Sequence, residues 1–350
     1  MIKKMSFSSV LIKWFNTNKR ELPWRKSKDP YRVWLSEIIL QQTKIKQGLP
    51  YYNKFIKNYP TVYDLAYTTE DKILKNWQGL GYYTRARNLH YTAKFIVEKL
   101  DGVFPKKYRD LLKLKGVGDY TASAIASICF EEPVAVLDGN VFRVLSRYFG
   151  INTPINSTNG LKEFKFLSKS LLPKKRIGDY NQAIMEFGAL QCKPKSPDCP
   201  ICPIKKNCFA FSNNSIKHLP FKIKKNRVKD RYFNFLVHLS RNSQTIIEKR
   251  KSKGIWQNLY QFPMIETKYS SSKKKLFSNK KNLEKYNLID LEIELINENE
   301  IIHKLSHQKL HIKFWKVHQK IKLDKLIDWR DLKKYPVPIP IAEFINSYKP

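Results

Sequence analysis

Four cysteines near the middle of the chain constrain its fold more than any other feature. Cys192, Cys199, Cys202 and Cys208 follow the spacing C-x6-C-x2-C-x5-C, and the prolines between them keep this segment out of a helix. Four thiols this close along the chain are expected to share one ligand, which predicts a metal site. Zinc and an iron-sulfur cluster both accept four cysteines, and the spacing matches neither common zinc-finger pairs nor ferredoxin runs. The spacing therefore leaves the metal open.

The remaining cysteine and the apolar pattern indicate a compartment. Cys129 lies far upstream of the other four, so disulfide pairing explains the cysteines poorly, and a metal site in a reducing cytosol explains them better. No apolar stretch reaches about 18 residues, which argues against a membrane span. The start of the chain lacks the apolar core and cleavage site of a secretory signal. We expect a cytoplasmic protein that does not contact a membrane.

The charge of the chain indicates a class of partner. Its 350 residues include 66 Lys and Arg against 30 Asp and Glu, which gives a formal net charge of +36. Such a charge creates a positive field that favours a polyanion, and nucleic acid is the first candidate. Lysine, asparagine and isoleucine also recur throughout the chain, as an AT-rich genome would produce. The charge alone therefore predicts no activity.

The pattern of helix-type and strand-type segments divides the chain into two predicted domains. Residues 1–211 read as helices broken by Gly, Pro and Asp, which predicts an all-α domain, and the polar, basic residues 212–229 are expected to form a linker. Residues 230–350 mix helical segments with alternating and β-branched strands, including a hairpin around 241–243. A Ser- and Lys-rich run over 269–281 is expected to be a mobile surface insertion. The fold class is therefore multidomain, an all-α domain followed by an α+β domain.

A pair of glycines predicts a tight turn between two helices at about residues 110–128. Gly116 and Gly118 flank one apolar residue in Leu114-Lys115-Gly116-Val117-Gly118. Glycines at these positions allow backbone N–H groups to approach a phosphate closely. The pattern is a helix-hairpin-helix, although a purely structural turn would have the same sequence.

Two acidic residues are candidate catalytic groups. Glu37 lies in a segment hydrophobic enough to be largely buried, and Asp138 precedes Gly139-Asn140-Val141. Breaking a glycosidic bond requires an acid to protonate the leaving group and a carboxylate to stabilise positive charge on the sugar. The environments of the two acids must then separate their pKa values. The alternatives are a solvated helix residue for Glu37 and a helix N-cap for Asp138.

Together these motifs resemble the MutY-type adenine DNA glycosylases over nearly all of residues 6–211. The resemblance rests on the hairpin, the four cysteines and four further segments, namely Leu22 to Arg25, Trp34 to Thr43, Gly79 to Arg87 and Val136 to Val141. It implies base-excision repair of double-stranded DNA in which adenine lies opposite 8-oxoguanine or guanine. It also implies that the iron-sulfur loop, residues 192–208, holds a [4Fe-4S] cluster. We further expect a monomer in the bacterial cytoplasm, associated with the nucleoid through DNA.

The resemblance assigns roles to individual residues. Glu37 would protonate adenine N7, and Asp138 would stabilise the oxocarbenium-like sugar. Tyr120 would lie beside these two acids, and Asn140 would position Asp138. The implied catalytic residues are therefore Glu37, Asp138, Tyr120 and Asn140.

A second group of residues is implied to contact DNA. Trp24 and Arg25 would line the adenine pocket, and Gly116 and Gly118 would face phosphate. Three residues are implied to enter the duplex around the oxidised guanine, and these are Gln42, Leu80 and Tyr82. For the aromatic residues Trp24 and Tyr82, core packing is the alternative interpretation.

The second domain resembles a Nudix-like module, weakly, through Gly254-Ile255-Trp256 and Tyr260-Gln261-Phe262-Pro263. It lacks the Glu-rich metal-binding box, so we expect recognition there and no phosphate hydrolysis. Ser306 and His307 match a Phe-Ser-His loop that senses oxidised guanine in the family, and Leu305 replaces the phenylalanine. Lys115 likewise replaces a usual hairpin proline. His303, His307 and His311 recur every four residues and are expected on a strand surface instead of on zinc.

Three alternatives to an adenine glycosylase stay open. A strand-cleaving enzyme of the endonuclease III type needs an amine to form a Schiff base, and the matching position holds Tyr120. A thymine-mismatch glycosylase shares this tyrosine but lacks the segment 37–43. A non-catalytic iron-sulfur DNA-binding protein is expected to lack Glu37 or Asp138.

Overall fold

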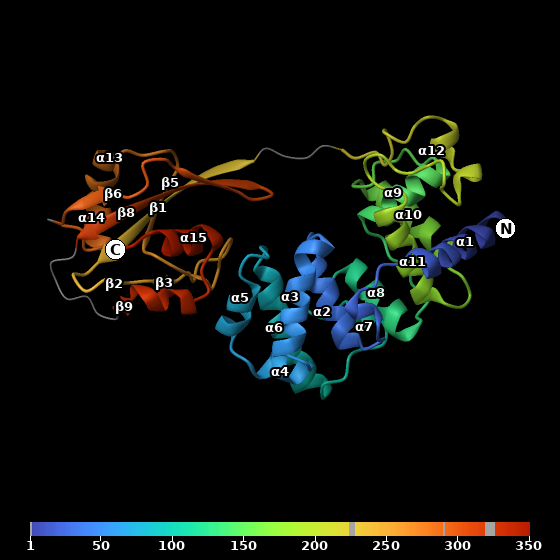
Figure 1. Ribbon diagram of the computed structural model, residues 1–350, viewed down its shortest axis with the longest axis horizontal. Coiled ribbons are helices and arrows are strands. Elements are labelled where there is room, and N and C mark those ends of the chain that lie inside the picture. Colours follow the sequence, from blue (N-terminus) through green and yellow to red (C-terminus); the bar gives the residue numbers. More distant parts are fainter. Residues whose placement is uncertain (1, 224–227, 290, 319–325) are drawn as a thin grey trace. The chain divides into compact units, whose positions relative to one another are not determined.

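The computed structural model describes residues 2–223, 228–289, 291–318 and 326–350, with side chains from Phe7 onward. Contacts divide the chain into two compact units, each traced in Figure 1. Unit 1 comprises Met1–Tyr67 and Asn88–Lys224, and unit 2 comprises Thr68–Arg87 and Lys225–Pro350. A segment from the first half of the sequence therefore belongs to the second unit.

Unit 1 consists of helices and connecting loops, without a strand among its described residues. In chain order its helices are α1 (Ile2–Asn18), η1 (Pro23–Arg25), α2 (Pro30–Leu40), α3 (Ile45–Asn58), α4 (Val62–Tyr67), α6 (Thr84–Leu100, from Asn88 onward), α7 (Tyr108–Leu111), α8 (Asp119–Phe130), α9 (Gly139–Phe149), α10 (Thr158–Ser170), α11 (Ile177–Leu190), η2 (Lys205–Asn207) and α12 (Phe209–Ser212). Among the described residues, no helix is long and apolar enough to cross a bilayer.

Helices α2, α8, α9 and α11 form the part of unit 1 that positions the site. Helix α11 packs against α8 and α9, and α2 packs against α8. A Cβ atom on Gly178 would lie 2.6 Å from the carbonyl oxygen of Ser127, and one on Gly188 would lie 2.6 Å from Cβ of Asn140. Because only glycine fits at these two positions, α11 can approach both neighbouring helices closely.

Unit 2 is built around a mixed sheet whose main path follows the order β5-β1-β8-β6, with β7 also paired to β8. The strands of this sheet are β1 (Lys229–Leu239), β5 (Met264–Thr267), β6 (Ile293–Leu295), β7 (Ile301–Lys304) and β8 (Gln308–His318). Strands β1 and β8 run parallel, and the other pairs are antiparallel. Two small pairs accompany it, β2 (Gln244–Thr245) with β9 (Ile327–Asp328), and β3 (Glu248–Lys249) with β4 (Tyr260–Gln261).

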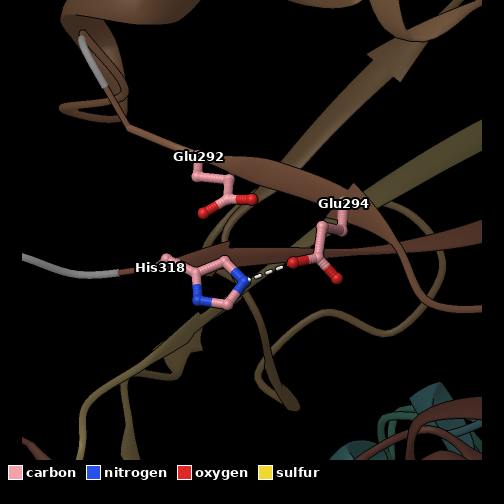
Figure 2. Close-up of side chains that lie close together, drawn as sticks. All are labelled: Glu292, Glu294 and His318. Carbon is pink, nitrogen blue, oxygen red and sulfur yellow. Dashed lines mark hydrogen bonds and ion pairs between the residues drawn. The ribbon is translucent and has the colours of Figure 1, made fainter.

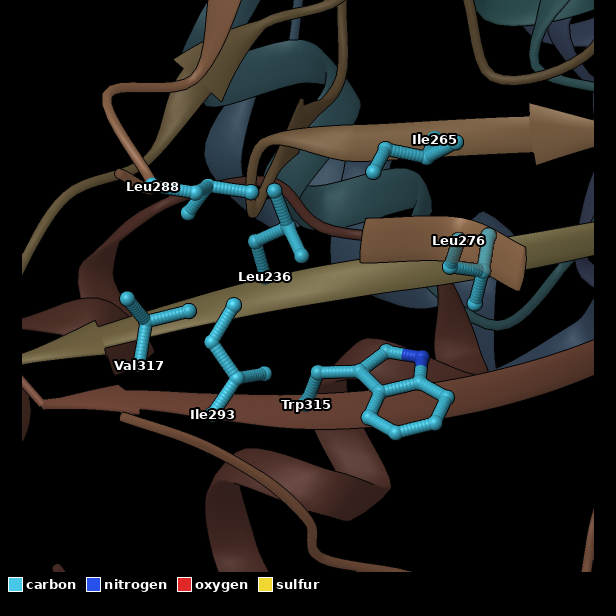
Figure 3. Packing of buried hydrophobic residues seen from close by; sticks show 7 residues of the cluster. All are labelled: Leu236, Ile265, Leu276, Leu288, Ile293, Trp315 and Val317. Atoms are coloured by element: carbon cyan, nitrogen blue, oxygen red, sulfur yellow. The ribbon is translucent and has the colours of Figure 1, made fainter. Parts of the chain in front are cut away.

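The helices of unit 2 are α5 (Glu70–Trp77), α13 (Lys273–Phe277), α14 (Lys280–Lys285), η3 (Trp329–Lys334) and α15 (Ile339–Ser347). Two of them, α13 and α15, pack on opposite faces of the sheet. On one face, Leu236 of β1 and Trp315 of β8 join Leu276 of α13 in an apolar cluster (Figure 3). On the other face, Phe314 of β8 stacks on Phe344 of α15, with ring centroids 3.8 Å apart. The side chains of successive residues of β8 thus point to opposite faces of the sheet and pack in different apolar clusters, as the two-residue period of a strand requires.

The predicted fold class is confirmed, since a helical unit is joined to a mixed α and β unit, but two local expectations were wrong. The turn at 241–243 leads into β2, which pairs with β9 and not with β1. The run 269–281 is no mobile insertion, because it contains α13 and the start of α14, and Leu276 is 2% exposed.

The predicted domain boundaries stay predictions, and the structure adds two observations to them. Within the expected linker, Leu219 is buried and the carbonyl of Phe221 accepts a hydrogen bond from the N–H of Ile155 at 3.0 Å. These residues therefore pack on unit 1. The described part of unit 2 resumes at residue 228, just before β1.

Candidate active site

Three helices of unit 1 bring the predicted acids and tyrosine together. Glu37 comes from α2, Tyr120 from α8, and Asp138 directly precedes α9. Glu37 and Tyr120 share a side-chain hydrogen bond, and the charge of Asp138 is close enough to raise the pKa of both. Residues separated by about a hundred positions therefore form one electrostatic unit.

The environment of Glu37 makes its carboxyl group a proton donor near neutral pH. Burial raises the pKa of Glu37 from 4.5 to about 7, and the negative charge of Asp138 contributes to the shift. The hydrogen bond with Tyr120 and the charge of Arg25 oppose it. The side chain stays partly accessible to solvent, so a reacting group can reach it. A carboxyl group with a pKa near the working pH is well suited to general acid catalysis.

Asp138 is both a helix N-cap and a neighbour of Glu37. Its Oδ1 accepts the backbone N–H groups of Asn140 at 2.9 Å and Val141 at 2.8 Å, and its Oδ2 accepts the amide of Asn140 at 2.7 Å. Burial raises the pKa of Asp138, while these hydrogen bonds and the charge of Arg143 oppose the rise. The cap alternative is therefore correct, and the same contacts fix the orientation of the carboxylate.

Tyr120 stays a neutral phenol at this site. Burial, followed by the charges of Glu37 and Asp138, raises its pKa well above 10. Its hydroxyl group also lies 3.2 Å from Sδ of Met185 on α11. This half-buried phenol can orient the carboxyl group of Glu37 but cannot form an imine with a sugar.

A buried ion-pair network that the sequence did not reveal lies on the same side of unit 1. The carboxylate of Glu186 on α11 forms ion pairs with the guanidinium groups of Arg20 and Arg25, at 2.6 Å and 2.9 Å. Burial alone would raise the pKa of Glu186, but the hydrogen bonds from the two arginines lower it to about 2. Arg25 is thereby fixed where its charge acts on Glu37. No local motif marks Glu186, because its partners lie more than 160 positions away.

A further arginine, Arg143, connects the candidate acids to the cysteine loop. Nε of Arg143 donates to the carbonyl of Cys192 at 2.8 Å, and its Nη2 donates to Oδ1 of Asn140 at 2.8 Å. Asn140 in turn donates to Asp138. A continuous chain of hydrogen bonds therefore runs from the first cysteine through Arg143 and Asn140 to Asp138.

The four cysteines line one small pocket between α9, α11 and the loop 192–208. Among the residues that the structure describes, no three cysteine sulfurs lie within 4.8 Å of one another. Zinc–sulfur bonds of about 2.3 Å would place the sulfurs of a tetrahedral site only about 4 Å apart. The donor set therefore fits a multinuclear cluster better than a single zinc ion. Arg147 contributes positive charge here, since its Nη1 lies 3.5 Å from Sγ of Cys192.

The predicted hairpin is present between α7 and α8. Gly116 has φ +83°, and a Cβ atom there would lie 2.8 Å from Cβ of Asn88. Gln41 at the end of α2 donates to the carbonyl of Gly116 at 3.4 Å and to Oγ1 of Thr121 at 3.2 Å. Gly118 is exposed directly before α8. Lys115 lies with its Nζ 4.4 Å from the ring centroid of Tyr91.

Two further predicted contacts of unit 1 have different environments. Trp24 is buried with its ring 5.0 Å from that of Tyr52, so core packing accounts for its conformation. Gln42 is exposed and has φ +55° directly after α2, a conformation that presents its side chain to solvent. The roles of both residues in DNA binding stay predictions.

Unit 2 contains a large pocket lined by three loops. The loops comprise residues 79–84, 253–257 and 303–308, and the pocket has a volume of about 780 Å³. It holds the predicted residues Leu80, Tyr82, Ser306 and His307. Leu80 is buried, whereas Tyr82 is 46% exposed with φ +47°, and its hydroxyl group contacts that of Ser306. The structure thus brings together two motifs that lie far apart in the sequence.

His311, expected on a strand surface, is buried between two carboxylates. Its Nε2 lies 2.9 Å from Asp230 and its Nδ1 lies 2.5 Å from Glu300, while the ring of Tyr232 stacks on it. Burial lowers its pKa, but the two carboxylates outweigh this effect and raise it overall. Both ring nitrogens are occupied, which leaves no free metal-binding atom.

One surface cluster of unit 2 has donor atoms that could face a cation. Glu292, Glu294 and His318 lie together at the paired ends of β6 and β8 (Figure 2). His318 already contacts Glu294 at 2.6 Å, and both glutamates are exposed. The cross-strand contact of His318 with Glu294 accounts for two members of this cluster.

Comparison with known proteins identifies both parts of the sequence. The family of HhH-GPD superfamily base excision DNA repair proteins matches residues 35–169, and the NUDIX domain family matches residues 234–347. A thermostable thymine-DNA glycosylase matches with a TM-score of 0.56 and 31% identity over 60% of this chain and 97% of that protein. An endonuclease III in a DNA complex matches with a TM-score of 0.52 and 23% identity. The match covers 60% of this chain and 95% of the endonuclease chain, so the two proteins share a fold.

Two relatives that share the sequence give a narrower assignment. The adenine DNA glycosylase of Buchnera aphidicola subsp. Baizongia pistaciae is 36% identical over 98% of this chain and 97% of its own length. The Homo sapiens adenine DNA glycosylase is 40% identical over 59% of this chain and 39% of its own length. Because similarity to the bacterial protein spans both units, the chain belongs to the adenine DNA glycosylase family.

Proposed function

We propose that the protein removes adenine from double-stranded DNA where adenine lies opposite 8-oxoguanine or guanine. The observation that carries this proposal is a carboxyl group, Glu37, with a pKa of about 7, hydrogen-bonded to Tyr120 and adjacent to the oriented carboxylate of Asp138. Two carboxyl groups in different environments are what acid-assisted cleavage of a glycosidic bond requires.

In the proposed reaction, Glu37 donates its proton to N7 of adenine while the bond between N9 and the sugar C1′ breaks. The bonding electrons leave with the base, which the added proton makes a neutral leaving group. Asp138, held by Asn140 and Val141, stabilises the positive charge that develops on the sugar. Water then adds its oxygen to C1′ and returns a proton to Glu37. The products are free adenine and an abasic site in an unbroken strand.

The base opposite adenine is proposed to be read by the pocket of unit 2. Tyr82 and Ser306 already contact each other there, and His307 and Leu80 lie in the same lining. The leucine at position 305 removes one aromatic contact from this lining, so we expect weaker lesion preference than an aromatic residue would give. The net charge of +36 supports binding to the phosphate backbone.

We propose that Cys192, Cys199, Cys202 and Cys208 hold a [4Fe-4S] cluster. When bound, the cluster would supply a rigid centre for a loop that carries Lys193, Lys195, Lys205 and Lys206. Anaerobically purified protein is expected to contain about four irons per chain and to absorb visible light. One zinc per chain without iron would contradict this assignment. The monomeric state and the cytoplasmic, nucleoid-associated location stay predictions.

Cleavage of a panel of duplexes tests the proposed function. Adenine opposite 8-oxoguanine and opposite guanine should be excised, whereas thymine opposite guanine should not. The strand should break only after alkali is added, since Tyr120 cannot form an imine. Borohydride should trap no protein–DNA adduct at the rate of base loss, and slower trapping through Lys113 or Lys115 would not affect the conclusion. Preferred excision of thymine, or trapping as fast as base release, would overturn the proposal.

A further inference from the structure

Residues 68–87 are part of the glycosylase family match but pack with the other domain. The HhH-GPD match spans residues 35–169, whereas contacts place Thr68–Arg87 in unit 2 with the Nudix-like residues. This segment contains α5 and the loop with Leu80 and Tyr82. One wall of the pocket in unit 2 therefore comes from the helical family domain, and the other walls come from residues 253–257 and 303–308.

The carboxylate of Asp71, in the first turn of α5, accepts hydrogen bonds from one residue of β3 and one residue of β4. Nζ of Lys249 on β3 lies 2.6 Å from Oδ1 of Asp71, and the hydroxyl of Tyr260 on β4 donates to Oδ2 at 3.1 Å. Lys249 also lies over the ring of Tyr260, 5.6 Å from its centroid. Asp71 thus has a separate partner on each carboxylate oxygen, and β3 and β4 hold these two partners side by side.

Further polar contacts join the same two parts of the chain. Glu70 accepts a hydrogen bond from the amide of Asn258 at 2.7 Å, and Lys75 donates to the carbonyl of Tyr335 at 3.1 Å. At the far end of the segment, Arg87 donates to the carbonyl of Gln257 at 2.8 Å. The loop 78–84 therefore lies between anchored ends. An exposed ion pair alone contributes little, but a network with fixed geometry couples its members.

We propose that Asp71 is a specificity-determining positioning residue. Through Lys249 and Tyr260 it holds the loop of Leu80 and Tyr82 at a fixed distance from the loop 253–257, which lies between β3 and β4, so that these walls of the pocket meet the base opposite adenine as one rigid surface. This inference rests on the proposed function for the identity of that base. Recognition sites lose selectivity when their supporting contacts loosen, even if the contacting residues are unchanged.

A charge swap tests the proposal. Asp71→Lys places two ammonium groups together, and Lys249→Asp in the same chain restores the opposite-charge pair in reversed order. The matched control is Asp331→Lys with and without Lys334→Asp, because this exposed pair at 2.7 Å also lies in unit 2. One readout is the ratio of single-turnover rate constants for adenine opposite 8-oxoguanine and opposite guanine. The other is hydrogen–deuterium exchange of residues 78–84 in DNA-free protein.

Asp71→Lys is expected to lower the rate ratio roughly 3–10-fold and to speed exchange of the loop, and the double swap should recover most of both. Added positive charge strengthens DNA binding in general, so it cannot by itself reduce discrimination. The control pair should change neither readout. If Asp71→Lys does not fold, Asp71→Asn replaces it, with smaller changes of the same sign.

Unchanged ratio and exchange, or a double swap that recovers neither, would show that Asp71 has no positioning role. Failure of the wild-type protein to excise adenine would instead overturn the proposed function. The exchange experiment would still decide whether Asp71 fixes the loop, because it requires neither DNA nor catalysis.

Discussion

At the residue scale, the site depends on how burial and charge separate carboxyl groups of the same chemistry. Burial and the charge of Asp138 raise the pKa of Glu37 to about 7, whereas two arginines lower the pKa of Glu186 to about 2. One glutamate can therefore release a proton near neutral pH, and the other remains a fixed anion that anchors Arg25. The sequence predicted Glu37 through its hydrophobic neighbours, but Glu186 had no comparable signal.

Excision should depend on pH through Glu37. Because the protonated form of Glu37 is the active one, excision should be fastest at pH values below its raised pKa and should be lost as the pH rises through about 7. Single-turnover rates should fall nearly tenfold per pH unit above pH 8. At low pH, protonation of Asp138 should reduce the rate again, at a pH above the ordinary aspartate value of 3.8. A rate that is constant or rises between pH 6 and 9 would contradict this role.

At the element scale, local patterns predicted the helices around the site better than the strands around the pocket. The helix N-cap alternative for Asp138 was correct, because α9 begins directly after this residue and is capped at its other end by Gly150. The turn at 241–243 was correct, but strand pairing depends on distant partners, and β2 pairs with β9. Leu276 was hidden in a lysine-rich run, although it fills the core of unit 2.

Helix α9 also carries a prediction about Arg143. Its hydrogen bonds to Cys192 and Asn140 orient the amide that holds Asp138. Arg143→Gln should slow single-turnover excision ~10–100-fold while DNA affinity changes little, as outer-shell substitutions commonly do. Arg176→Gln is the control, since Arg176 is a half-exposed arginine of the same unit paired with Asp179. Equal rates for the Arg143 and Arg176 variants would exclude the coupling.

At the scale of the whole molecule, the division into units differs from the order of the chain. Sequence texture placed one boundary in residues 212–229, and no local pattern indicated that Thr68–Arg87 packs with the second unit. The anchoring contacts of this segment join residues at least 170 positions apart, such as Arg87 and Gln257, so a local pattern cannot reveal them. His311 was placed on a surface because strand alternation alone does not show which residues face it, and its partners Asp230 and Glu300 come from other segments, 81 and 11 positions away.

Truncation of the chain after Lys224 should change both lesion preference and thermal stability. Asp71 and Tyr82 would lose their partners, and the pocket of unit 2 would be absent. The shortened protein should therefore excise adenine opposite guanine but lose most of its preference for 8-oxoguanine, and its melting temperature should fall by several degrees. Rate ratios and thermal unfolding measure these effects. An unchanged preference would place lesion recognition entirely within the remaining residues.

The most direct test of the central claim is single-turnover excision by the Glu37→Gln variant on a duplex with adenine opposite 8-oxoguanine. Glutamine preserves the size of the side chain but cannot donate the proton, so the rate should fall by ~10²–10⁴-fold while DNA affinity stays nearly unchanged. Loss of catalysis with retained binding would identify Glu37 as the proton donor. Substantial excision by the variant, with the pH dependence of the wild-type protein, would contradict it.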